Sequence, residues 1–229
     1  MYVTWSTLEL AEPASACPWS PQGVRFSQAG QAGAGRAEIP AFAGRWWSVL
    51  GIWDDDPSAD LAQWSAAGTE VSAWHVVLQP ASYRGDARLA GGARPFDGLS
   101  SRGKVAGAAA VITMAGLGPD PARASEFFER FTALGTDVER APGHRAALGQ
   151  APEDGAVRTF SAWTSLRDAV TWAYHRPDHA ATVRRQEEHQ LLTSTGFLRC
   201  AVLASTGTLH GRDPLHGLTG TPLPAKELA

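Results

Sequence analysis

The chain has 229 residues, of which 44% are hydrophobic and 19% charged, and its formal net charge is −3. This composition predicts a folded chain with a sizeable core, and the lack of a basic run argues against a nucleic-acid partner. The longest apolar run, VAGAAAVITMAGLG, is too short and too rich in Ala and Gly to span a bilayer. The start MYVTWSTLEL lacks the pattern of a signal peptide, so we expect a cytoplasmic protein.

In the first half, alternating apolar and polar residues predict strands, at 2–10, 24–30, 45–53 and 70–78. The Pro- and Ser-rich segment 13–23 predicts a loop in place of a helix. Asp56 or Ser58 has a side-chain oxygen that can cap a helix running to about Ala67.

In the second half, beyond a Gly/Ser-rich bridge, the same reasoning predicts strands at 105–115, 144–150, 157–163 and 197–206. Pro121 suits the first turn of a helix over 121–134, whose apolar side chains share one face. Thr164 or Ser165 caps a further helix to about Tyr174.

The two halves contain a faint duplication. Segment 25–64 carries a Gly-Gln corner and a strand ending in Trp53, and segment 145–173 carries the same features with Trp163. A unit used twice, with the order of a ferredoxin-like βαββαβ motif, predicts tandem ferredoxin-like repeats that form an intrachain α+β barrel. We place one half at 1–100 and the other at 101–229, within one barrel domain.

The stretch TWAYHRPDHAATVRRQ (171–186) carries a candidate ligand. Pro177 cannot continue a helix, so the chain breaks there and restarts at Asp178. This places His179 in the first turn of a new helix, where the dipole keeps its imidazole neutral and able to bind a metal. A single histidine can hold a heme iron from one side. The alternative is that His179 lies on a solvated helix face.

Neighbouring residues offer rivals and helpers. His175 and His189 lie on the same stretch and compete for the ligand role. Arg184 and Arg185 suit heme propionates, since a guanidinium matches a carboxylate, although a solvated helix face also explains them. The only cysteines, Cys17 and Cys200, lack the spacing of a zinc site or a disulfide scaffold. The nine tryptophans either fill a core or line an aromatic cavity, and composition favours the core.

Two longer segments, TFSAWTSLRDAVTWAYHRPDHAATVRR (159–185) and GFLRCAVLASTGTLHGRDPL (196–215), together resemble the spheroidene monooxygenase family of carotenoid-modifying enzymes. RFSQAGQAG and VLGIW fit the first half of that pattern. The resemblance implies a dimeric-type α+β barrel and a heme-dependent activity with heme b.

The resemblance also implies site residues. His179 stands at the family's histidine position and becomes the expected axial iron ligand, with Arg184, Arg185, Trp163 and Trp172 beside the cofactor. Arg199, in the family's Phe-x-Arg segment, is the expected catalytic cation on the distal or substrate side. Cys200 replaces the family's second Phe, which argues against a long carotenoid substrate.

We therefore expect a heme-dependent monooxygenase or peroxygenase that acts on an apolar or biosynthetic small molecule, as a monomer or homodimer. One alternative is redox-neutral chemistry at an N–O bond, as in the aldoxime dehydratases. Another is a cofactor-free barrel oxygenase or cyclase, in which Trp74 and His75 would line the cavity. A third is a heme or lipid binder without catalysis.

Overall fold

Eight strands close into one barrel in the computed structural model, which describes residues 1–34, 44–64, 70–151, 156–176, 181, 185 and 191–218. The strands are β1 (Tyr2–Leu10), β2 (Phe26–Ala34), β3 (Trp46–Trp53), β4 (Glu70–Gly85), β5 (Ala109–Leu117), β6 (His144–Ala151), β7 (Ala156–Trp163) and β8 (Leu192–Gly207). The helical elements are α1 (Pro121–Glu139) and α2 (Leu166–His175), with 3₁₀ turns η1 (Pro57–Gln63) and η2 (Ala90–Gly92).

The barrel confirms the predicted fold class. Neighbouring strands follow the order β1-β3-β2-β6-β7-β5-β8-β4, and every pair is antiparallel. Read as two halves, this is β4-β1-β3-β2 followed by β8-β5-β7-β6, the same ferredoxin-like order twice. A single polypeptide therefore closes the barrel, because β2 pairs with β6 and β4 pairs with β8.

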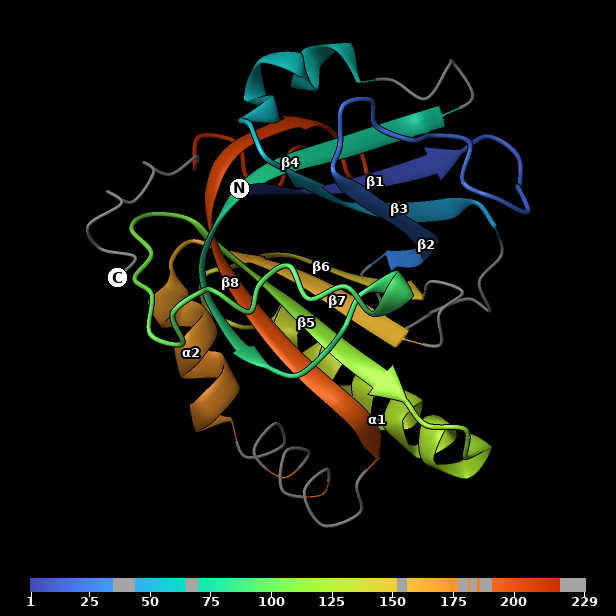
Figure 1. Ribbon diagram of the computed structural model, residues 1–229, viewed down its shortest axis with the longest axis vertical. Helices are drawn as coiled ribbons and strands as arrows, with labels where there is room; N and C mark the ends of the chain where they lie inside the picture. Colours follow the sequence, from blue (N-terminus) through green and yellow to red (C-terminus); the bar gives the residue numbers. More distant parts are fainter. Residues whose placement is uncertain are drawn as a thin grey trace.

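The two α-helices of the described residues lie on the C-terminal half, whereas the N-terminal half carries the 3₁₀ turn η1 beside β4 (Figure 1). Helix α1 lies against β6, and α2 lies against β5 and β7. Asp120 caps α1 by accepting a hydrogen bond from the Ala122 amide, and Pro121 occupies the first turn as predicted. In the first half, the chain between β1 and β2 forms no helix in the described residues, which agrees with the loop prediction.

Three predicted elements need correction. The helix expected up to Ala67 is the 3₁₀ turn η1, since this polar segment has too few apolar side chains to bury an α-helical face. Strand β4 runs further than predicted, because Pro80 lies at a register shift of the ladder, and β8 starts earlier than predicted, because residues 192–196 pair with β5. The helix expected from His179 to Leu192 falls largely outside the described residues.

The barrel interior is a packed core. Trp5 is fully buried and stacks on Phe160 with ring centroids 5.3 Å apart, while its indole N–H donates to Thr7 Oγ1. The chain after β4 (86–96, the first hook) and after β8 (208–215, the second hook) adds further buried side chains to this core. Most of the tryptophan side chains that point into the barrel therefore fill its core, as the composition predicts.

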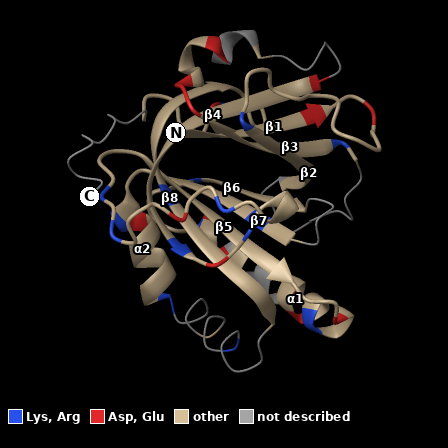
Figure 2. Ribbon diagram, viewed as in Figure 1, with Lys and Arg blue, Asp and Glu red and all other residues tan. Residues whose placement is uncertain are grey.

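Charged residues lie mainly in loops and near strand ends, and most of the strand ribbons carry neither sign (Figure 2). This pattern fits a barrel whose inner face is apolar. No helix in the described part of the chain is long and apolar enough to cross a membrane.

Candidate functional site

The outer face of the N-terminal half is sealed by tryptophans. Trp19 and Trp47 are 9% and 6% exposed, and they pack with Leu8 and Val49 in one apolar cluster. The Trp47 indole N–H donates to the Gly44 carbonyl at 2.9 Å, so its polar atom is satisfied. Because loop residues and η1 take the place of helices here, side chains close directly onto the sheet.

His75 lies beneath this cover and is only 2% exposed. Its Nδ1 is 2.9 Å from Ser6 Oγ, and its ring lies 5.4 Å from Trp19 and 5.7 Å from Trp64. Burial lowers the pKa of His75 to about 4, and the Trp64 backbone and then Glu70 oppose this shift without cancelling it. Although the Trp64 backbone raises the pKa of His75, the Nε2 atom of His75 has no hydrogen-bond partner in the structure. His75 is therefore a neutral imidazole at pH 7.

Trp74, the neighbour of His75 along β4, points the opposite way, as successive strand residues must. It is fully buried inside the barrel, where its indole N–H reaches Ser205 Oγ at 2.9 Å and Asp213 Oδ1 at 3.1 Å. Trp74 and His75 therefore cannot line one cavity. In a cofactor-free barrel these two residues could therefore not act together, and that alternative stays a prediction.

The outer face of the C-terminal half is different, because its central side chains are small and half-buried. Gly149, Thr159 and Thr113 lie opposite one another across β6, β7 and β5. The next row toward the helices contains Ser161 and, on β8, Arg199. We call these five residues the outer strip. Residues directly opposite in an antiparallel sheet share a face, so the strip forms a continuous surface.

Arg199 is the one cation of the outer strip. It is half-buried and makes no hydrogen bond or ion pair with any residue in the described part of the chain. Phe197, two residues earlier on the same face, is 40% exposed. A guanidinium and an aromatic ring on a half-buried face are the side chains that hold a polar end and an apolar body of a small molecule.

His144 belongs to the same face and was missed by sequence reasoning. It opens β6 opposite Trp163, with ring centroids 5.2 Å apart, and its buried Nε2 has no hydrogen-bond partner. Burial lowers the pKa of His144, opposed by an interaction of the ring N–H with the Ala146 backbone, so the neutral ring is favoured at pH 7. Strand alternation gave no signal for it, because alternation groups His144 with the inward-facing Ala146 and Leu148, and a register shift between His144 and Ala146 is what turns the ring outward.

Trp163 and Trp172 pack together where the helices meet the sheet. Their rings are 5.9 Å apart, and Trp163 is 1% exposed. Trp163 donates to Ser161 Oγ, and Trp172 donates to the Asp137 carboxylate of α1, each at 2.9 Å. Both side chains thus hold α1 and α2 against the sheet at one end of the outer strip.

Arg185 forms an ion pair with a residue of α1. Its Nε lies 2.9 Å from the Glu126 carboxylate, and this ion pair accounts for the guanidinium without a propionate. His179 and Arg184, the expected ligand and second propionate partner, lie outside the described residues. His175 ends α2 and is exposed.

The residues of the outer strip fit a heme in three respects. The strip side chains other than Arg199 are small, Arg199 has no partner among the described residues and suits an anionic substituent, and His144 on the same face carries an orphaned ring nitrogen. Among the described residues there is no cluster of three or more His, Cys, Asp or Glu that would hold a metal ion by itself. A porphyrin-bound iron needs only an axial ligand, so this finding is compatible with the fit.

Comparisons with known proteins give the fold and little else. No protein-family model matches the chain, and no curated sequence is similar to it. A provisionally assigned monooxygenase from Fusobacterium nucleatum is 11% identical, with 93% of this chain and 96% of that chain covered and a TM-score of 0.43. An anthrone oxidase-like protein is 11% identical, with coverages of 90% and 93% and a TM-score of 0.36.

An aldoxime dehydratase in complex with butyraldoxime is 12% identical, with 88% of this chain and 79% of that chain covered and a TM-score of 0.47. At these identities the likeness concerns the arrangement of strands and helices alone. None of these three structures is a spheroidene monooxygenase, so that resemblance stays a prediction.

Proposed function

We propose that the chain is a heme-dependent enzyme of oxidative chemistry, with heme b bound over the outer strip and His179 as the axial ligand. The observation that carries this proposal is the contrast between the two outer faces. One is sealed by tryptophans, whereas the other leaves small side chains half-buried beside Arg199, which has no partner among the residues that the structure describes. The sequence resemblance supplies the choice of cofactor and ligand.

The residues of the chain would divide the remaining work. Arg199 holds an anionic or polar group of cofactor or substrate, because a half-buried guanidinium without a partner gains most from a charged acceptor. The hydroxyls of Thr113 and Thr159 offer donors across the strip, whereas the Ser161 hydroxyl already donates to the Val111 carbonyl, and Phe197 shields the strip from water. Heme, when bound, supplies the oxidative reactivity, while the protein supplies orientation and a dry surface.

A spectrum of hemin-reconstituted protein tests the proposal. We expect a Soret band at one hemin per chain, lost or strongly shifted in His179→Ala and retained in the matched control His175→Ala. Retention in His179→Ala together with loss in His144→Ala would move the ligand to β6. A protein that takes up no hemin at all would refute a heme enzyme.

A second candidate is redox-neutral chemistry at an N–O bond on the same strip. The observation in its favour is the row of hydroxyl side chains, which can hydrogen-bond to an N–OH group. Product analysis separates the two: butyraldoxime converted to a nitrile without an oxidant supports dehydration. Peroxide- or oxygen-dependent incorporation of oxygen into an apolar substrate supports oxidation.

A further inference from the structure

A recess lies at one end of the barrel, under the first hook. Its volume is about 550 Å³, and hook residues 86–94 form one wall. The end of β5 and the starts of β7 and β8 form the other wall. None of the outer-strip residues lines this recess. It is therefore a separate feature from the proposed heme site.

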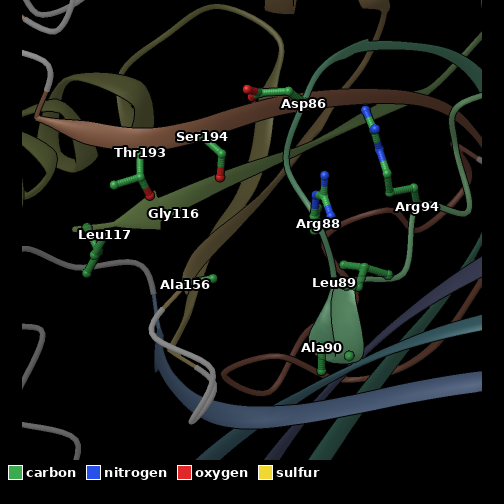
Figure 3. A pocket seen from close by; sticks show the side chains of 12 residues that line it. Asp86, Arg88, Leu89, Ala90, Arg94, Gly116, Leu117, Ala156, Thr193 and Ser194 are labelled. Carbon is green, nitrogen blue, oxygen red and sulfur yellow. The ribbon is translucent and has the colours of Figure 1, made fainter. Parts of the chain in front are cut away.

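The polar groups of the recess come from both walls (Figure 3). Arg88 and Arg94 project from the hook, while Thr193 and Ser194 bring hydroxyls from β8. Arg94 is already neutralised by Asp97, with Nε and Oδ2 3.0 Å apart.

Arg88 is the second cation of the lining. It is exposed and makes no ion pair or hydrogen bond with any residue in the part of the chain that the structure describes. Asp86 is the acidic residue of the lining, and its Oδ1 accepts a hydrogen bond from the Thr195 amide at 2.9 Å. Of the three charged lining side chains, Arg94 forms an ion pair with Asp97 outside the recess, and Arg88 and Asp86 form no ion pair with each other.

The apolar part of the lining decides the class of ligand. Leu89, Ala90, Leu117 and Ala156 contribute carbon surface between the polar groups. Gly116 has no side chain to fill the base of the recess, and a Cβ at this position would lie 2.5 Å from Ser194 Oγ. A recess of this size holds more than an inorganic anion, and pockets of this kind bind small molecules with few polar anchors.

We propose that this recess binds a small organic carboxylate, with the Arg88 guanidinium as the carboxylate fork, Ser194 and Thr193 as hydroxyl donors, and the apolar lining against the body of the ligand. An arginine offers two parallel N–H donors to a carboxylate, which gives geometry as well as charge. The Asp86 carboxylate at the same rim disfavours multiply charged anions, so a monoanion fits better than phosphate.

Calorimetric titration of the full chain at low salt, with benzoate and its neutral isostere benzamide as probes, tests the proposal. We expect benzoate to bind and benzamide to bind about tenfold more weakly. Arg88→Gln should lose this preference, whereas Arg212→Gln, an exposed arginine of the second hook, should keep it. Ser194→Ala should weaken benzoate binding without changing the melting temperature.

Three results would overturn the proposal: equal binding of the two probes, binding of inorganic phosphate as tight as benzoate, or unchanged benzoate binding in Arg88→Gln. Because Arg88 is exposed, its substitution should leave folding intact, and Ser194→Ala provides an independent variant if it does not. Benzoate binding should persist in His179→Ala, so failure of the heme proposal would leave this test unaffected.

Discussion

The two halves of the barrel share one strand order but treat their outer faces in opposite ways. In the N-terminal half, Trp19, Trp47 and Trp64 lie directly on the sheet and bury His75 to 2% exposure. In the C-terminal half, α1 and α2 lie against β5, β6 and β7, and the outer strip stays half-buried (Figure 1). The difference follows from what covers each sheet: indole rings pack onto strands without a gap, whereas helices cover only part of the face.

This contrast shows how a duplicated unit can divide its tasks. The barrel interior is common to both halves, so either outer face can change without opening the core. A sealed face adds apolar burial and stability, while an open face offers a site. Substitutions of Trp47 and His75 test the sealed face, a substitution of Thr113 tests the open face, and a substitution of Ser165 tests the start of α2.

The largest effect is expected from the sealed face. Trp47→Ala removes a 6% exposed indole and its hydrogen bond to the Gly44 carbonyl. We expect the free energy of unfolding to fall by about 3–5 kcal/mol, the usual cost of removing a buried aromatic side chain. Urea unfolding measures it, with Val71→Ala on an exposed strand position as the control. A loss below about 1 kcal/mol would show that the indole is not packed as described.

Acid should weaken the sealed face through His75. Its pKa is about 4 in the folded chain and near 6.5 when unfolded, so only the unfolded state takes up the proton between these values. Stability is therefore lost as the pH falls from 6.5 toward 4, by about 3 kcal/mol in all. Urea unfolding at several pH values should show a shallower acid slope in His75→Leu. Identical slopes would contradict a buried neutral imidazole.

Substitutions on the open face, which carries the outer strip, should change ligand binding and leave the stability of the fold nearly unchanged. Thr113→Phe fills the centre of the outer strip with a bulky ring, and we expect hemin affinity to fall at least about tenfold, or about 1.4 kcal/mol. Because Thr113 is half-buried, the free energy of unfolding should change by less than about 1 kcal/mol. Hemin titration followed at the Soret band measures the first effect. Trp47→Ala should bind hemin like the parent chain, and a reversed pattern would exchange the roles of the two faces.

The smallest effect concerns the start of α2. Ser165 caps this helix by accepting from the Asp168 amide, and the Asp168 carboxylate accepts hydrogen bonds from Thr164 and Ser165. These hydrogen bonds hold the pKa of Asp168 below its usual value. Ser165→Ala should cost about 1 kcal/mol in thermal unfolding. Arg167→Ala, a neighbouring exposed position, serves as control, and an equal loss there would argue against the cap.

The fold was largely predictable because it depends on strand alternation and on a repeated order of elements. The full length of β4 and β8 was not, since Pro80 reads as a strand end but lies at a register shift, and the polar Thr193 and Ser194 read as a loop. Their pairing partners are far away in sequence. The ladder of β4 with β8 and the ladder of β8 with β5 decide these boundaries, and local propensity does not.

The site was predictable only in part. Arg199 was singled out by resemblance, and it lies on the open face, whereas Thr113, Thr159 and Gly149 carried no local signal. They form a strip because β6, β7 and β5 bring them into register, which single-sequence patterns do not encode. Arg185 looked like a propionate partner because its carboxylate, Glu126, lies on a helix far away in the sequence.

The most direct measurement is chemical rescue of the iron ligand. His179→Gly, reconstituted with hemin, should lose the histidine-ligated Soret spectrum of the parent chain and regain it when imidazole is added. The outer strip would then hold the porphyrin while free imidazole replaces the missing ring. A His179→Gly protein whose spectrum equals that of the parent chain before any imidazole is added would contradict the account.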